Sequence, residues 1–145
     1  MMKRRILLGT FAAMMLGTGL FSSVAHAQSY YATNQAQESY DAGINFERQA
    51  EQKGDSNLLK SAIKSYEAAV KADPNMVSAY ARLGYVHYAL KSSDEGILRM
   101  REGLRNNPNN VELQHYLGLN LFQNNEIEES EKVLNEVVKK RDDLA

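Results

Sequence analysis

Few side chains in this chain are of the types that usually carry catalysis or bind metals. The chain has 145 residues, three histidines and no cysteine. The absence of cysteine excludes a disulfide framework, a thiolate metal site and a cysteine nucleophile. The histidines are His26, His87 and His115, and no two of them have the spacing of a helical metal-binding pair. We therefore expect no metal site.

A pair of carboxylates is the remaining candidate for acid–base chemistry. Glu47 and Glu51 are four residues apart and would share one face of a helix. General acid–base catalysis also needs a desolvated pocket, and the chain has no P-loop, no Gly-x-Gly-x-x-Gly and no Gly-x-Ser-x-Gly motif. The sequence therefore predicts a protein that is not an enzyme and that needs no cofactor.

Composition and charge are those of an ordinary globular chain. Hydrophobic residues make up 43% and charged residues 24%, with two prolines, and the length allows one domain. The formal net charge of −1 offers no basic surface for a phosphate backbone, so we expect no nucleic-acid partner.

The segment 1–27 is expected to be a secretory signal peptide rather than part of the fold. Basic residues precede an apolar stretch from Ile6 to Phe21, and Ala25 and Ala27 are the small residues of a cleavage site. We expect cleavage after Ala27. The alternative is an uncleaved membrane anchor, for which the apolar stretch is short.

Several expectations about export follow. The cleavage site has no cysteine, so the protein is not expected to be a lipoprotein. The mature chain is predicted to be periplasmic or secreted, without membrane insertion. Arg4 and Arg5 also fit a minimal twin-arginine pattern, so the general and the twin-arginine export routes both stay open.

A single repeat period runs through the remainder of the chain. Pro74 and Pro108 are 34 residues apart, and so are the Leu-Gly pairs that begin at Leu83 and Leu117. Four further series repeat three times: Ala62, Gly96 and Ser130; Tyr66, Met100 and Leu134; Ala69, Gly103 and Val137; Val70, Leu104 and Val138. Several series that share one period predict tandem structural units.

This pattern resembles the tetratricopeptide repeat family, whose unit of about 34 residues carries aromatic, Leu-Gly, small and proline positions at set offsets. The three repeats are placed at about 43–76, 77–110 and 111–144, in a domain from 36 to 145 that follows a disordered lead-in at 28–35. The third repeat departs from the pattern, with Gln114 at the aromatic position and Asp142 where proline is usual. The resemblance implies an all-α, right-handed solenoid of three helix–turn–helix repeats.

The pattern also predicts where helices begin and end. Small residues let paired helices approach closely, and proline ends the second helix of a pair. The expected helices span about 36–53, 57–72, 76–90, 94–106, 110–123 and 126–141. Ser56, Asp94 and Asn125 are the expected N-terminal caps.

The resemblance further implies a binding surface. First helices of stacked repeats line a concave face, and the family contacts its ligands through the second, fifth, ninth and twelfth positions of each repeat. In the first repeat these positions are Ile44, Glu47, Glu51 and Gly54. The predicted partner-binding residues are Ser78, Ala81, Arg82, Tyr85, Tyr88, Glu112, His115, Leu119 and Phe122. Helical spacing independently places the four positions of each repeat on one face.

These residues predict a protein or peptide partner. The groove would be aromatic and apolar over its last two repeats and acidic at Glu47 and Glu51, so the bound segment would carry apolar side chains and a basic residue. The alternative is that Tyr85, Tyr88 and Phe122 complete the packing between repeats. Clamping of a chaperone's carboxylate tail is not expected, because the usual lysine and asparagine are missing.

The C-terminal helix suggests a second role. Few residues follow Val138, so part of its apolar set, Ile127, Val133, Leu134, Val137 and Val138, would stay exposed and could form a homo-oligomer. The opposing interpretation is that the run of acidic residues from Glu126 to Glu131 keeps this face solvated. The leading prediction is an exported adaptor or scaffold, by analogy an assembly factor for a cell-envelope complex. The alternative is a structural protein that stacks through this helix.

Overall fold

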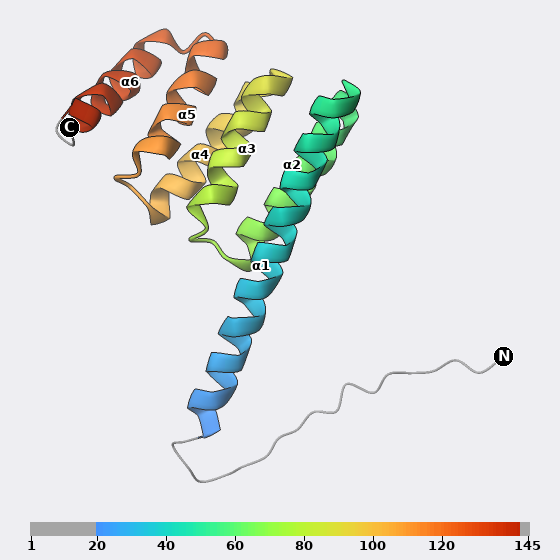
Figure 1. Ribbon diagram of the computed structural model, residues 1–145. Coiled ribbons are helices and arrows are strands. Elements are labelled where there is room, and N and C mark those ends of the chain that lie inside the picture. The colour runs from blue at the N-terminus through green and yellow to red at the C-terminus, as the bar shows by residue number, and fades with distance from the viewer. Residues whose placement is uncertain (1–19, 143–145) are drawn as a thin grey trace.

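The computed structural model describes residues 20–142, and this part of the chain contains helices and no strand. The helices are α1 (Leu20–Lys53), α2 (Ser56–Ala72), α3 (Val77–Leu90), α4 (Ser93–Asn106), α5 (Val111–Gln123) and α6 (Ile127–Asp142). They form a row of three antiparallel pairs, α1–α2, α3–α4 and α5–α6 (Figure 1). The prediction of an all-α fold is confirmed. In the described range, no helix is long and apolar enough to cross a membrane.

The predicted helix boundaries agree with the structure to within one residue, except at the start of α1. The caps are less accurate. Asp55 caps α2 by accepting a hydrogen bond from the backbone N–H of Asn57 at 2.9 Å, and Ser56 is already helical. The reason is that Gly54 ends α1 with a φ of 64°, so Asp55 is the next residue free to turn the chain.

Two other expected caps are also wrong. Ser92 precedes α4, so Asp94 lies inside that helix. Asn125 adopts a left-handed φ of 65° in the turn before α6, which is a conformation that asparagine tolerates. The side chain that does cap a helix in this half of the chain is Asn110, which accepts from the N–H of Leu113 at 2.9 Å.

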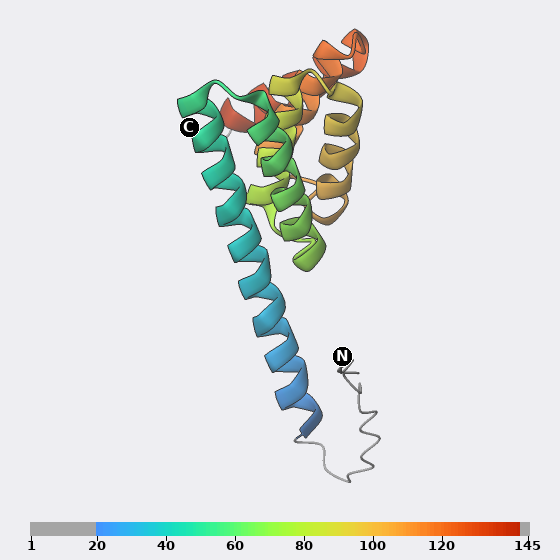
Figure 2. The ribbon, with the colours of Figure 1, turned by 90° about the vertical axis from the view of Figure 1, so that its right-hand side faces the viewer.

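Helix α1 extends well beyond its expected start. Residues 28–35 were expected to be disordered, and the structure places them in α1. The chain has no proline or glycine between Leu20 and Gly43 that would break a helix. This part of α1 projects past the other helices (Figure 2), and Ala36 is the first of its side chains to be buried. The predicted signal peptide lies largely outside the described residues.

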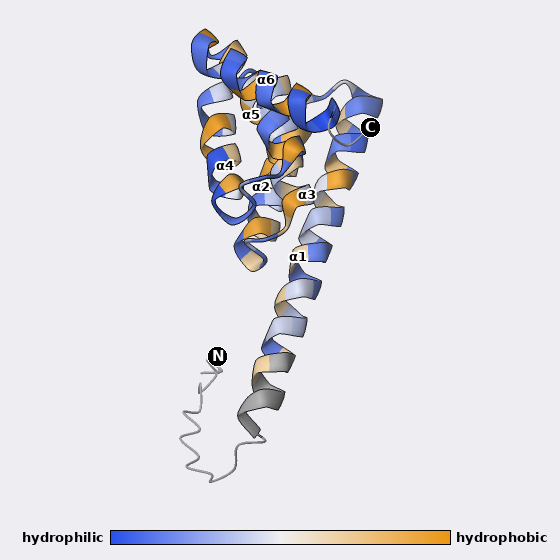
Figure 3. Ribbon diagram, turned by 90° about the vertical axis from the view of Figure 1, so that its left-hand side faces the viewer, coloured by the Kyte–Doolittle hydropathy of each residue, from blue (hydrophilic) through white to orange (hydrophobic). Residues whose placement is uncertain are grey.

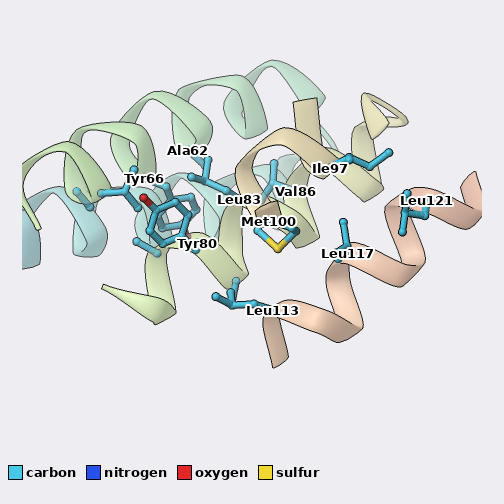
Figure 4. Packing of buried hydrophobic residues seen from close by; sticks show 14 residues of the cluster. Ala62, Tyr66, Tyr80, Leu83, Val86, Ile97, Met100, Leu113, Leu117 and Leu121 are labelled. Atoms are coloured by element: carbon cyan, nitrogen blue, oxygen red, sulfur yellow. The ribbon is translucent and has the colours of Figure 1, made fainter. Parts of the chain in front are cut away.

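The core lies between the helices of the row. Its largest fully buried side chains include Tyr66, Tyr80, Leu83, Met100 and Leu113 (Figure 4). Hydrophobic residues gather where the helices face one another (Figure 3). The helices of the body therefore owe their stability mainly to the burial of these faces rather than to helix propensity alone.

The sequence period is visible in the packing itself. A Cβ atom added at Gly84 would lie 2.6 Å from the sulfur of Met100, and one added at Gly118 would lie 2.5 Å from Leu134 Cδ2. Each glycine therefore lets the large residue of the following helix pack directly on its backbone. The same contact recurs one period later, as the sequence predicted.

Polar contacts join neighbouring pairs of helices. Asn120 in α5 is fully buried, and its Nδ2 donates to the backbone carbonyl of Gly84 in α3 at 3.0 Å. Arg99 in α4 also binds Glu67 in α2 at 2.7 Å. The pairs are thus linked by specific bonds as well as by apolar packing.

Candidate functional site

A cavity of about 560 Å³ opens between α1, the start of α2 and α3. Its apolar wall includes Ile44, Leu59 and Ala89. Its polar wall carries Glu47, Glu51, Arg48, Asp55, Ser56 and Arg82, and Tyr85 stands at its edge. All four residues that the first repeat was expected to contribute, Ile44, Glu47, Glu51 and Gly54, line this cavity.

A polar cluster of Glu47, Arg82 and Tyr66 adjoins the cavity, and its first two residues line it. The Glu47 side chain is 13% exposed, and its Oε2 lies 3.6 Å from the Arg82 guanidinium. Its other oxygen accepts a hydrogen bond from the hydroxyl of Tyr66. Burial, together with that carboxylate, raises the pKa of Tyr66 well above its ordinary value, so the hydroxyl remains a donor.

This cluster changes the expected chemistry of the acidic end. Both oxygens of Glu47 have partners within the protein, Arg82 and Tyr66. Glu51 is exposed, lines the same cavity and forms no salt bridge within the described part of the chain. Glu51 is therefore the more accessible carboxylate of this pair.

A row of aromatic rings continues from the cavity onto α5. The ring centroids of Tyr85 and Tyr116 are 6.3 Å apart, and those of His115 and Tyr116 are 5.6 Å apart. Both pairs meet edge to face, the arrangement that aromatic quadrupoles favour. Burial and the nearby charge of Arg141 lower the pKa of His115, outweighing the opposing effect of Glu112. The His115 ring is therefore mostly uncharged near neutral pH.

The predicted site residues differ in how accessible they are. Tyr85 is 42% and Phe122 is 61% exposed. Ser78, Arg82 and Glu112 are also exposed, whereas Tyr88, His115 and Leu119 are half-buried. Ala81 is 4% exposed and belongs to the core cluster, so it presents little surface to a partner. Its small side chain packs inward, beneath the surface that Tyr85 presents.

Arg82 and Tyr85 both line the cavity, and His115 belongs to the row of aromatic rings. Tyr88, Leu119 and Phe122 lie outside the lining of the cavity.

Sequence reasoning missed two residues of this surface, Arg48 and Tyr116. Arg48 lines the cavity and Tyr116 joins the rings of Tyr85 and His115. Each stands one repeat period from Arg82. The repeat would have identified both residues if the position of Arg82 had been read in all three units.

Metal chemistry has no ready site in the part of the chain that the structure describes, where no group of three potential ligands comes together. His87 is 5% exposed and lies away from the cavity, with its Nδ1 2.8 Å from Ser92 Oγ. The expectation that His87 packs between helices is confirmed. The chain was also compared with known proteins: no family model matches it, and no curated protein matches its sequence.

Proposed function

We propose that this protein is a non-catalytic adaptor or scaffold of the tetratricopeptide repeat type, which binds a segment of a partner protein along α1, α3 and α5. The observation that carries the proposal is the open cavity between α1 and α3, continued by the row of aromatic rings on α3 and α5. The repeat period, seen again in the Gly84–Met100 and Gly118–Leu134 contacts, supports the family assignment.

The lining suggests what such a segment carries. Ile44, Leu59 and Tyr85 offer apolar and aromatic contact area for one or two apolar side chains. Glu51 offers a carboxylate at the rim for a basic residue. A segment with apolar residues flanked by a lysine or arginine fits this chemistry, and an acidic segment does not.

The apolar stretch and the Ala25–Ala27 site in the sequence support an activity outside the cytoplasm. The proposed role is therefore an exported adaptor that holds components of a cell-envelope assembly. That last step rests on analogy with other exported repeat proteins.

Site-specific photo-crosslinking in the cells that naturally make this protein tests the proposal. A benzophenone amino acid replaces Tyr85 in one chain and Leu98 in a second. Leu98 is a matched control, because it is 59% exposed but lies on α4, outside the cavity lining. We expect position 85 to capture a discrete partner that position 98 does not.

Substitution provides the second arm. We expect the Tyr85→Ala, Phe122→Ala double variant to capture the partner at least about tenfold less, which corresponds to about 1.4 kcal/mol. The Leu98→Ala variant should capture as much partner as the parent. Equal capture by all three folded proteins, with helicity checked by circular dichroism, would refute a site on this face.

A further inference from the structure

The two ends of the row of helices differ in polarity. Ala79 and Val86 in α3 are fully buried. One period earlier, the corresponding residues of α1 are Asn45 and Gln52, and both are exposed. Helix α1 therefore closes its end of the row with polar side chains.

Helix α6 presents apolar side chains at the opposite end. Met100 in α4 is fully buried, and one period later Leu134 in α6 is half-buried. Val138 is 56% exposed and Ile127 is 38% exposed. Ile127, Leu134 and Val138 are spaced by seven and four residues, so they form one stripe along α6.

These three residues define the α6 stripe, in which Ile127 and Val138 are exposed, whereas Leu134 is half-buried and packs against Gly118 of α5. Helix α6 lies at the outer end of the row (Figure 1). A further helix pair, stacked as α5–α6 stacks on α3–α4, would meet Glu131 at the position where α4 has the buried Ile97. Such stacking would cover Glu131, and burial of an unpaired carboxylate costs several kcal/mol, whereas a contact between two single helices leaves this side chain at its edge, within reach of water.

The charges of α6 suggest a different occupant. Glu128 and Glu129 lie in its first turn, and Lys139, Lys140 and Arg141 lie in its last turn. Glu128 and Lys139 are exposed and form no salt bridge within the described residues. A second α6 running antiparallel would place basic residues against acidic ones at both ends.

We propose that the α6 stripe is a self-association surface, on which two copies of this chain pair their α6 helices antiparallel about a two-fold axis. With the axis midway between Glu131 and Leu134, Ile127 lies opposite Val138 of the second copy. Glu128 then lies within one turn of Lys139 of the second copy, on the same flank of the pair. Each of these contacts occurs twice.

A hollow at the start of α6 fits this arrangement. It measures about 400 Å³ and is lined by Ile127 together with Asn125, Glu126, Glu128 and Glu129. The basic last turn of the second copy would approach this acidic hollow. A head-to-tail arrangement would place the α6 stripe of one copy against the α1 end of another. That end is polar because of Asn45 and Gln52, so it does not match the stripe.

The pairing is expected to be reversible. A contact between two helices of about four turns falls below the roughly 1,000 Å² typical of stable interfaces. We therefore expect a dissociation constant on the order of micromolar rather than an obligate dimer.

Sedimentation equilibrium of the protein produced from the full-length gene tests the pairing. We expect a monomer–dimer equilibrium over concentrations from about 1 µM to about 500 µM. The Val138→Arg variant should weaken association at least about tenfold, since it places two cations in the interface. The Leu98→Arg variant, equally exposed on α4, should leave the dissociation constant unchanged. A monomer throughout, or equal weakening by both variants, would overturn the proposal.

A charge exchange tests the antiparallel geometry. The Glu128→Lys and Lys139→Glu variants should each dimerise less than the parent, because each places like charges together twice. An equimolar mixture of the two variants should dimerise as well as the parent, because reciprocal pairs form again in the mixed dimer. Failure of the mixture to recover, with both variants folded, would rule out this geometry.

Discussion

At the scale of single residues, His87 shows how packing determines a protonation state. The ring is buried, Nδ1 lies 2.8 Å from Ser92 Oγ, and Nε2 has no hydrogen-bond partner among the described residues. A second ring proton would therefore be buried without an acceptor. Burial lowers the pKa of His87, with smaller effects from Glu95 and Glu67, which raise it, and from Arg99, which lowers it.

This lowered pKa predicts how stability depends on pH. The unfolded chain binds a proton at the ordinary pKa of about 6.5, while the folded chain resists it. The free energy of unfolding is therefore complete above that pH and declines as the pH falls from 7 to 5. In the His87→Gln variant, we expect the free energy of unfolding to decline less steeply as the pH falls. The slope should decrease by up to about 1.4 kcal/mol per pH unit, which is the limit for one proton.

Urea titrations at several pH values measure the slope. The His115→Gln variant is the control, because His115 has a lowered pKa but is only half-buried, and it should remove a smaller part. An unchanged slope in the His87→Gln variant would show that other groups cause the decline.

The candidate site shows what residue-level prediction could achieve. Helical spacing correctly placed Tyr85 on an exposed face, because side chains seven residues apart share a direction. It could not show that Ala81 packs inward, since that depends on the neighbouring helix. Likewise, the spacing of Glu47 and Glu51 could not reveal that Tyr66 and Arg82 occupy the first carboxylate.

At the scale of elements, the period and the helix-breaking residues predicted most of the boundaries. Pro74 and Pro108 follow the ends of α2 and α4, and Gly54 ends α1. Between Leu20 and Gly43 the chain has no such marker, because this stretch contains only residues that a helix accepts. Composition alone therefore failed to distinguish a projecting helix from a disordered segment.

The point where α1 meets the body can be tested with two neighbouring positions. Ala36 is 1% exposed, whereas Gln35 is exposed. We expect the Ala36→Asp variant to lower the free energy of unfolding by about 2–4 kcal/mol, because it buries a charge. The Gln35→Asp variant should change it by less than about 0.5 kcal/mol.

Chemical denaturation of the two variants measures the difference. Equal and large losses would mean that the projecting part of α1 is also packed in solution. Equal and negligible losses would mean that α1 contacts the body only beyond residue 36.

At the scale of the whole molecule, the three pairs of helices unfold together only if the contacts between them are strong. Asn120 is a central link, since it donates to Gly84 in the neighbouring pair and packs where Gly96 leaves room. We expect the Asn120→Ala variant to lose about 1–3 kcal/mol. Its unfolding should also become less cooperative, with a smaller m-value, because α5–α6 separates earlier.

Denaturation followed by circular dichroism provides the measurement. Asn124 offers a matched control, since its Nδ2 also joins the second and third pairs, through Asp94 at 2.9 Å, but in a solvent-exposed setting. The Asn124→Ala variant should keep the parent's m-value. Loss of stability in the Asn120→Ala variant with an unchanged m-value would mean that the pairs remain coupled without this bond.

The middle pair contributes buried residues from both of its helices, Ala79 and Val86 from α3 and Ile97 and Met100 from α4. Each outer pair has its own kind of outer surface: α1 carries polar side chains, and α6 carries the α6 stripe. The segment 77–110 is therefore the unit that can be duplicated in tandem without altering either end. Evolution or an engineer can lengthen the molecule by inserting copies of it, which extends the inner surface while both termini keep their chemistry.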